Sequence, residues 1–428
     1  MQYLIFKHDL YNPRCLMRSK TLLCWLLLSS ELTFSQQEIK PSFIPPSPES
    51  VALAKYSEIP VSKYTGVPNI SIPLYEIDGK KLNLPISLSY HASGIKVAEE
   101  ASRVGLGWSL NAGGVVSRVA RGRYDDHPGG FMTATPTVDE ILNMSLSAQT
   151  EEFIEVSDGT LDVEADIFHF NFNGRSGKFF FDQSGNYYIS PTQNIKIETL
   201  RTDSSNPLHI TGWKFTDETG SSYYFGISGD GSRSSVDRSY SEGYCGFGND
   251  SGNPTTGISS WHLLSIHDVN KTDNIELDYS SYILDTKCEL TSETKYELIT
   301  VSDDCSQKSD ERCYSQSWLI GKKLKTVNFD KGSVEFVYNS TRLDLLGDST
   351  LNEIKIYDKG NNLKKSFELS YDYFISSDYT PNRYCNVSGE PGKYRLKLMA
   401  VNEKSDTGQP LNPYTFTYNS RNLPEKAS

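Results

Sequence analysis

The chain reads YHASGIKV at residues 90–97 and VGLGWSLNAGG at residues 104–114, and this stretch is unusually rich in glycine. Glycine permits positive φ angles and lets neighbouring strands approach closely. A tryptophan among glycines can fill the space that the missing side chains leave. We therefore predict a packed β corner here, with a structural role and no direct catalytic chemistry. The residues of this corner are Gly94, Gly105, Gly107, Trp108, Asn111, Gly113 and Gly114.

Segments on both sides of this corner alternate apolar and polar residues with a period of two, as half-buried strands do. Gly and Asn turns separate many of these segments, which favours antiparallel hairpins. The clearest segments are LPISLSY (84–90), IELDY (275–279), FELSY (367–371) and YTFTY (414–418). Their unequal spacing does not indicate a regular solenoid or propeller. We predict an all-β chain of antiparallel, hairpin-rich sheets with long loops.

The first 35 residues have the pattern of an export signal. Basic residues precede the apolar run TLLCWLLL at 21–28, which is too short to span a bilayer. Met17 is an alternative to Met1 as the start of this signal. We expect an exported protein, either secreted or held at the cell surface, without a transmembrane segment.

The rest of the chain divides into four regions by composition and pattern. Residues 36–60 form a Pro/Ser-rich lead-in, and residues 61–160 hold the Gly/Trp corner, a polar loop and a short helix near 138–146. Residues 161–258 form a second β region that ends in a Gly/Ser loop. Residues 259–428 form a third β region of hairpins.

Charge and cysteine content narrow the range of partners and cofactors. The net charge is −12 and is spread along the chain, which argues against a nucleic-acid partner because duplex binding needs a basic stripe. Cys305 and Cys313 bracket a short polar loop and are a candidate disulfide, with unpaired thiols as the alternative. Cys-x-x-Cys pairs and interleaved histidines are missing, which disfavours a metal site.

Familiar catalytic patterns are incomplete in this sequence. GISSW at 257–261 lacks the final glycine of a nucleophile elbow, and the glycines at 105 and 107 lack the third glycine of a dinucleotide loop. Many acidic residues occur, but no pair stands out as the two carboxylates of a glycoside hydrolase. We expect no catalytic, cofactor-binding or metal-binding residue, no cofactor and no enzymatic activity.

Two further groups of residues allow competing interpretations. Arg121 and Arg123 could meet an anionic ligand, but we favour pairing with Asp125, Asp126 or Glu99. The turn at 125–127 could likewise touch a cation, although a solvated turn is the simpler interpretation. Adjacent aromatic residues at 187–188 and 223–225 could stack on sugars, but in a strand one of each pair normally faces the core.

The corner sequence resembles the N-terminal region of secreted Rhs/YD-repeat proteins of Bacteroidetes-type bacteria. Its shorter Gly-x-Gly-Trp-Ser-Leu core is similar to the N-terminal part of insecticidal toxin-complex B components. Further matches occur at DIFHFNFNGRSGKF (166–179), WHLLSI (261–266) and YRLKL (394–398), so the resemblance covers roughly residues 42–420. The Tyr-Asp repeats that name the family do not occur in this sequence.

This resemblance implies sheets that coil as at the start of an Rhs shell, with a distorted sandwich as the alternative. It implies an exported, non-enzymatic β-scaffold, the leading segment of a surface or toxin-delivery protein. The expected partner is the repeat and C-terminal part of a longer Rhs-like protein. An adhesin or carbohydrate-binding module, with surface glycans as partners, is the alternative function, and a glycoside hydrolase is the third.

Overall fold

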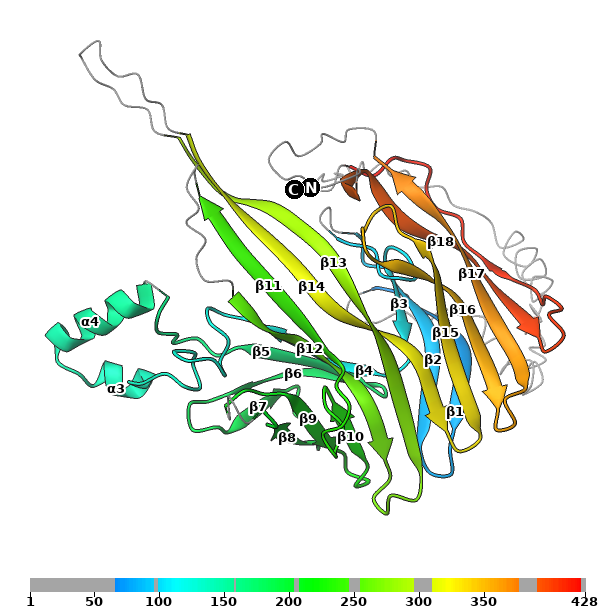
Figure 1. Cartoon of the computed structure of the whole chain (residues 1–428), viewed down its shortest axis with the longest axis horizontal. Helices are drawn as coiled ribbons and strands as arrows, with labels where there is room; N and C mark the ends of the chain where they lie inside the picture. Colours follow the sequence, from blue (N-terminus) through cyan, green and yellow to red (C-terminus); the bar gives the residue numbers. More distant parts are fainter. Residues whose placement is uncertain are drawn as a thin grey trace, which may run out of the picture. The chain divides into compact units, whose positions relative to one another are not determined.

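The computed structural model describes residues 66–95, 99–157, 159–203, 208–245, 255–295, 310–376 and 391–424. These residues belong to one structural unit, Pro60–Ser428. The export signal expected at 1–35 and the lead-in expected at 36–60 lie outside the described residues. Strands dominate the described part of the chain and pair antiparallel, so the all-β prediction is confirmed (Figure 1).

A three-stranded antiparallel sheet begins the described chain. Its order is β1 (Asn69–Asp78), β2 (Asn83–His91) and β3 (Trp108–Asn111). The predicted alternation over 84–90 is borne out by β2, in which Leu84, Ile86 and Leu88 are buried and the residues between them are more exposed. One face of this small sheet therefore joins the core and the other carries polar side chains.

The remaining strands form a 16-stranded sheet within the described residues. Its main path runs β19-β18-β17-β16-β15-β14-β11-β12-β4-β5-β6-β7. Strand β13 pairs with β12 and β14, and strands β8, β9 and β10 join the sheet through β12. Strands from all three β regions expected between 61 and 428 thus share one sheet. The bounds are β4 (Gly114–Val119), β5 (Ile167–Phe172), β6 (Arg175–Phe181), β7 (Tyr187–Ser190), β8 (Lys196–Leu200), β9 (Gly212–Thr216), β10 (Ser222–Phe225), β11 (Val236–Cys245), β12 (Thr255–His267), β13 (Asn274–Lys295), β14 (Asp310–Phe329), β15 (Gly332–Thr341), β16 (Ser349–Asp358), β17 (Leu363–Ile375), β18 (Tyr394–Ser405) and β19 (Tyr414–Thr415).

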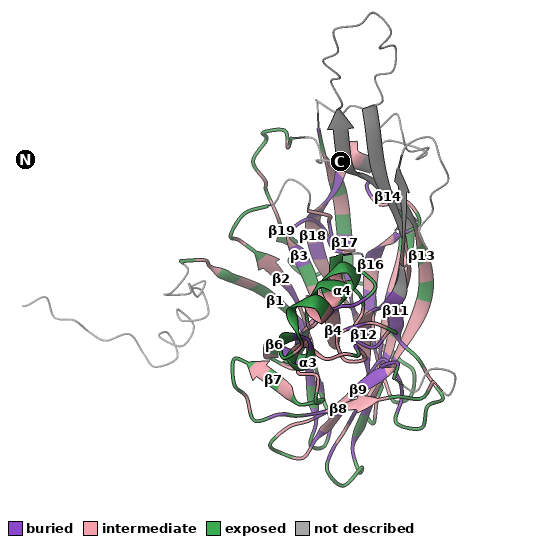
Figure 2. Ribbon diagram, turned by 90° about the vertical axis from the view of Figure 1, so that its left-hand side faces the viewer, coloured by how far each residue is buried: buried purple, intermediate pink, exposed green. Residues whose placement is uncertain are grey.

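Helical structure is confined to short segments in the described residues. Helix α3 (Val138–Leu142) starts where the sequence predicts a helix, because the side chain of Thr137 and that of Glu140 form a capping box. Helix α4 (Leu146–Ser157) follows and has no buried residue, as its colouring in Figure 2 shows. A single 3-10 turn, η1 (Pro391–Lys393), precedes β18. None of the helices in the described ranges has the length and apolar character that crossing a membrane requires.

The predicted strand at 414–418 is shorter than expected. Strand β19 includes only Tyr414–Thr415, although the N–H of Phe416 still donates to the carbonyl of Met399. The side chains of Phe416 and Tyr418 both contact Trp108, as described below.

Aromatic rings form a connected cluster within the core. Strand β5 reads IFHFNF, and its phenylalanines are buried while His169 and Asn171 between them are exposed. Phe168 lies 5.0 Å from Trp213 between ring centroids, and Trp213 lies 5.4 Å from Trp261. Tilted and edge-to-face pairs of this kind contribute roughly 0.5–1.5 kcal/mol each beyond the area they bury. This cluster joins β5, β6, β9 and β12.

Adjacent phenylalanines on β6 offer a matched test of this core. Phe179 is fully buried, whereas Phe180 is 42% exposed. We expect Phe179→Ala to lower the free energy of unfolding by about 3–5 kcal/mol because it leaves a cavity. Phe180→Ala should cost under about 1 kcal/mol. Denaturant unfolding of both variants checks this, and equal losses would contradict the assignment of faces on β6.

Candidate functional site

Trp108 links the start of the described chain to its end. Its ring is 5% exposed and lies 5.1 Å from the ring of Tyr90 and 4.7 Å from that of Phe416. The indole Nε1 donates a hydrogen bond to the hydroxyl of Tyr418 at 3.0 Å. That hydroxyl donates in turn to the carbonyl of Leu398 at 2.7 Å. Trp108 thus joins β3 to the segment that follows β19 and to β18.

Two glycines of the corner allow this approach. Gly105 and Gly107 have φ angles of +110° and +75°, which side-chain-bearing residues rarely adopt. A Cβ on Gly105 would lie 2.9 Å from the backbone nitrogen of Leu398, and one on Gly107 would lie 2.8 Å from the Tyr90 ring. The N–H of Leu106 between them donates to the carbonyl of Leu396 at 2.8 Å. The loop therefore lies directly on β18.

The other predicted corner residues differ in their surroundings. Gly114 packs tightly, since an added Cβ would lie 2.5 Å from Cβ of Phe172, and one on Gly113 would lie 3.0 Å from Leu277. The amide of Asn111 donates to the hydroxyl of Ser89 at 3.0 Å. Gly94 stands apart, because an added Cβ there would meet no atom within 4 Å.

Buried ion pairs hold the same loop against the far end of the sheet. Arg342, Asp344 and Asp348 have side chains at most 2% exposed. Arg342 pairs with Asp344 at 2.9 Å and with Asp348 at 3.2 Å, and Asp348 also pairs with Arg103 at 2.8 Å. Asp344 accepts a hydrogen bond from the N–H of Leu396. These contacts connect the corner loop, the β15–β16 connection and β18.

The acidic turn at 125–127 is not the solvated turn that the sequence indicates. Asp125 and Asp126 are buried. Asp126 pairs with Arg118 at 2.9 Å, and the Asp125 and Asp166 carboxylates each accept a hydrogen bond from the backbone N–H of the other residue. Asp166 lies 41 positions from Asp125, too far along the chain for the local sequence to reveal it, whereas Arg118 is only eight positions from Asp126. Within the described ranges, no group of three or more His, Cys, Asp and Glu side chains is arranged to hold a metal ion.

The expected pairing of Arg121 and Arg123 with Asp125 and Asp126 is wrong. Arg121 approaches Glu164 at 4.0 Å, and Arg123 donates to backbone carbonyls of the loops beside it. The arginine that pairs with the acidic turn is Arg118, because it lies on the buried face of β4.

Burial and charge shift the acids of this cluster in opposite directions. Burial, together with the charge of Asp166, raises the pKa of Asp125 to about 8. Burial also opposes ionisation of Asp126, but the charge of Arg118 and a hydrogen bond from the N–H of Ile210 outweigh it and lower the pKa of Asp126. Burial also raises the pKa of Asp166, the partner of Asp125.

The candidate disulfide falls largely outside the described residues. Cys305 lies outside them, and Cys313 lies on β14, where the backbone register places it opposite Cys245 of β11. A bridge between Cys305 and Cys313 stays a prediction.

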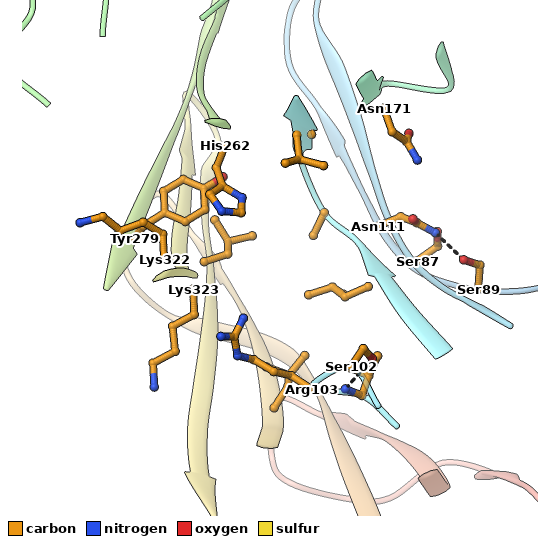
Figure 3. Close-up of a pocket in the computed structure, with 18 of the residues that line it drawn as sticks. Ser87, Ser89, Ser102, Arg103, Asn111, Asn171, His262, Tyr279, Lys322 and Lys323 are labelled. Carbon is orange, nitrogen blue, oxygen red and sulfur yellow. Dashed lines mark hydrogen bonds between the residues drawn. The ribbon is translucent and has the colours of Figure 1, made fainter. Parts of the chain in front are cut away.

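A cavity of about 980 Å³ lies between the small sheet and strands β12–β14 (Figure 3). We call it the polar cleft. One side carries hydroxyl and amide groups. Among them, the hydroxyl of Ser89 forms a hydrogen bond with that of Ser109 at 2.8 Å and accepts one from the amide of Asn111. The other side carries His262, tyrosines and lysines from β12, β13 and β14. The lining residues with polar or charged groups include Ser71, Ser87, Ser89, Arg103, Asn111, Asn171, His262, Tyr279, Tyr282, Lys322, Lys323, Tyr338, Arg342 and Asp348.

The basic groups of the polar cleft are held in different ways. The Arg103 guanidinium lies 4.2 Å from the centroid of the Tyr282 ring and pairs with Asp348. Lys323 donates to Ser349 and lies 5.1 Å from the centroid of the Tyr338 ring. Burial and the nearby charge of Arg103 lower the pKa of Lys323.

The single acid that lines the described part of this cleft is Asp348, and it is already paired with two arginines. Two carboxyl groups facing a cleft are the usual requirement for glycoside hydrolysis. The arrangement can bind a polar ligand but lacks that pair. Sequence reasoning missed the cleft because its two sides come from segments about 200 residues apart.

Comparison with known proteins gives structural likenesses but no match of sequence. No family model matches the sequence, and no curated protein matches it significantly. Among solved structures, the chain is similar to the N-terminal domain of effector protein SpvB from Salmonella typhimurium strain LT2. The TM-score is 0.40 and the identity 12%, over 78% of this chain and 98% of that one. A likeness at this level assigns neither a family nor a function.

A glycine pair offers a test of the corner packing. Gly105 and Gly94 both have positive φ, at +110° and +112°, but only Gly105 lies against other atoms. Gly105→Ala should therefore cost about 1–3 kcal/mol more free energy of unfolding than Gly94→Ala, because crowding adds to the shared backbone strain. Denaturant unfolding measures both variants. Similar losses would mean that β18 does not lie against residue 105.

The raised pKa of Asp125 predicts a pH dependence of stability. Its folded pKa of about 8 exceeds its ordinary value of 3.8, so folding takes up a proton between these pH values. The contribution of Asp125 to the free energy of unfolding is thus most favourable below pH 4, and it declines as pH rises toward 8. Asp125→Asn removes this loss and keeps an oxygen that can accept from the N–H of Asp166. Between pH 6 and pH 9, the free energy of unfolding of the variant should rise by roughly 2 kcal/mol relative to that of the wild type. If the free energy of unfolding of the variant and of the wild type changes with pH in the same way, the raised pKa of Asp125 is contradicted.

Proposed function

We propose that the chain is an exported, non-enzymatic β-scaffold, the leading segment of an Rhs/YD-repeat-like surface or toxin-delivery protein. The main support is the set of contacts that the corner residues make. Trp108, Gly105 and Gly107 hold the small sheet against β18 and the segment near Tyr418, 310 positions away in the sequence. Their contacts are with backbone and core atoms, as a structural role requires.

The β19 edge of the large sheet supports a repeat region as the expected partner. Strand β19 pairs only with β18 among the described residues, so its other edge can accept a further strand. Tyr414 on β19 is 49% exposed. We infer that strands of a repeat region extend the sheet from this edge. In this role, the chain begins a shell that carries a C-terminal module.

Carbohydrate binding is the second candidate, and one observation favours it. Phe180 and Tyr188 on neighbouring strands are 42% and 52% exposed, and their rings stack at 5.5 Å with an interplanar angle of 20°. Exposed aromatic faces of this kind can stack on sugar rings. The other aromatic run offers no such surface, because Tyr223 and Phe225 are buried.

The coding DNA beyond codon 428 gives the most direct test of the scaffold role. We expect an in-frame run of Tyr-Asp repeats there, or in an adjoining reading frame, and we expect the protein outside the cytoplasm in fractionated cells. Absence of repeats from both frames would overturn the leading-segment role. Turnover of a glycoside substrate by the purified chain would overturn the non-enzymatic assignment.

A further inference from the structure

We propose that the polar cleft binds an acidic saccharide, that is, a sugar with a carboxylate in addition to its hydroxyl groups. This goes beyond the scaffold role and does not depend on it. The cleft differs from the exposed pair of Phe180 and Tyr188, whose rings carry no positive charge. Its volume of about 980 Å³ is at the upper end of ligand pockets, which suits an oligosaccharide better than a small ion.

One side of the cleft matches sugar hydroxyls. The register places Ser71 beside Ser89, both of which line the cleft, and continues this row to Ser109 on β3, outside the lining. Asn111 joins this row through its amide nitrogen, and its carbonyl oxygen has no partner among the described residues. Serine hydroxyls and asparagine amides both donate and accept, so they can pair with sugar hydroxyls in either direction.

The other side concentrates positive charge. Four lining residues are basic (Arg103, Lys322, Lys323 and Arg342), but Asp344 and Asp348 pair with the two arginines, so the positive charge that is left comes from the lysines. The ammonium of Lys322 donates to Ser281 and that of Lys323 to Ser349, so neither ammonium has a carboxylate partner within the described ranges, although the backbone N–H of Lys322 donates to the carboxylate of Asp237. Charges of one sign that line a cleft with low-dielectric walls attract a ligand of the opposite sign.

The two sides together select the ligand class. Figure 3 shows Ser87, Ser89 and Asn111 opposite the strands that carry His262, Lys322 and Lys323, with Arg103 between them. A simple anion would use only the basic side, and a neutral sugar only the hydroxyl side. A nucleic acid would require a basic surface far longer than this cleft. A carboxylated sugar uses both sides at once.

Calorimetric titration with two matched pairs of probes tests this inference. The pairs are trigalacturonic acid with its methyl ester, and sialyllactose with lactose. We expect at least one acid to bind about tenfold more tightly than its neutral partner, as a charge-assisted hydrogen bond implies. Binding should weaken as salt rises. If neither acid binds more tightly than its neutral partner, the inference is overturned.

Variants of the full chain locate the site. Lys323→Gln should weaken binding of the acid about fivefold or more, whereas Lys325→Gln, an exposed lysine on the same strand outside the cleft, should change it less than about twofold. Asn111→Ala should weaken the acid and its neutral partner alike. Tyr188→Ala should leave binding unchanged. Loss of binding in Tyr188→Ala, with Lys323→Gln unaffected, would place the ligand on the exposed aromatic pair and overturn the cleft assignment.

Discussion

The contact between the corner loop and β18 is the constraint on which the closure of this fold depends. The loop reaches β18 only because residues 105 and 107 lack side chains, and the Trp108 indole then finds the Tyr418 hydroxyl. Local alternation produces the individual strands, but this long-range contact brings the first of them to the last.

Buried charges reinforce the same closure. Removing water from Arg342, Asp344 and Asp348 is costly, and the pairs compensate only while each member keeps its partners. Loss of one member of such a network typically costs about 3–5 kcal/mol. The network around Arg118 does the same for the loop that precedes the helices, tying it to the start of β5 and to Ile210. Both networks thus favour one arrangement of loops over its alternatives.

The sequence allowed prediction of the strands more fully than of the sites. Alternation at 84–90, 275–279 and 367–371 marks strands β2, β13 and β17, because a two-residue period reports burial directly. The acidic turn was misread because Asp126 meets Ile210, 84 positions away, and no local pattern encodes such a partner. The polar cleft could not be predicted for the same reason. Its serines alternate in the sequence like any row of solvent-facing residues, and only the folded chain places β12–β14 opposite them.

The link between Trp108 and Tyr418 also imposes an order on biosynthesis. A ribosome releases the small sheet long before it has made the residues that complete the corner, and domains with such distant partners fold slowly. During that interval the apolar face of β1 and β2 has no final partner, and it must be kept from other chains. The nascent protein is therefore most vulnerable to aggregation while about three hundred residues are still to be added.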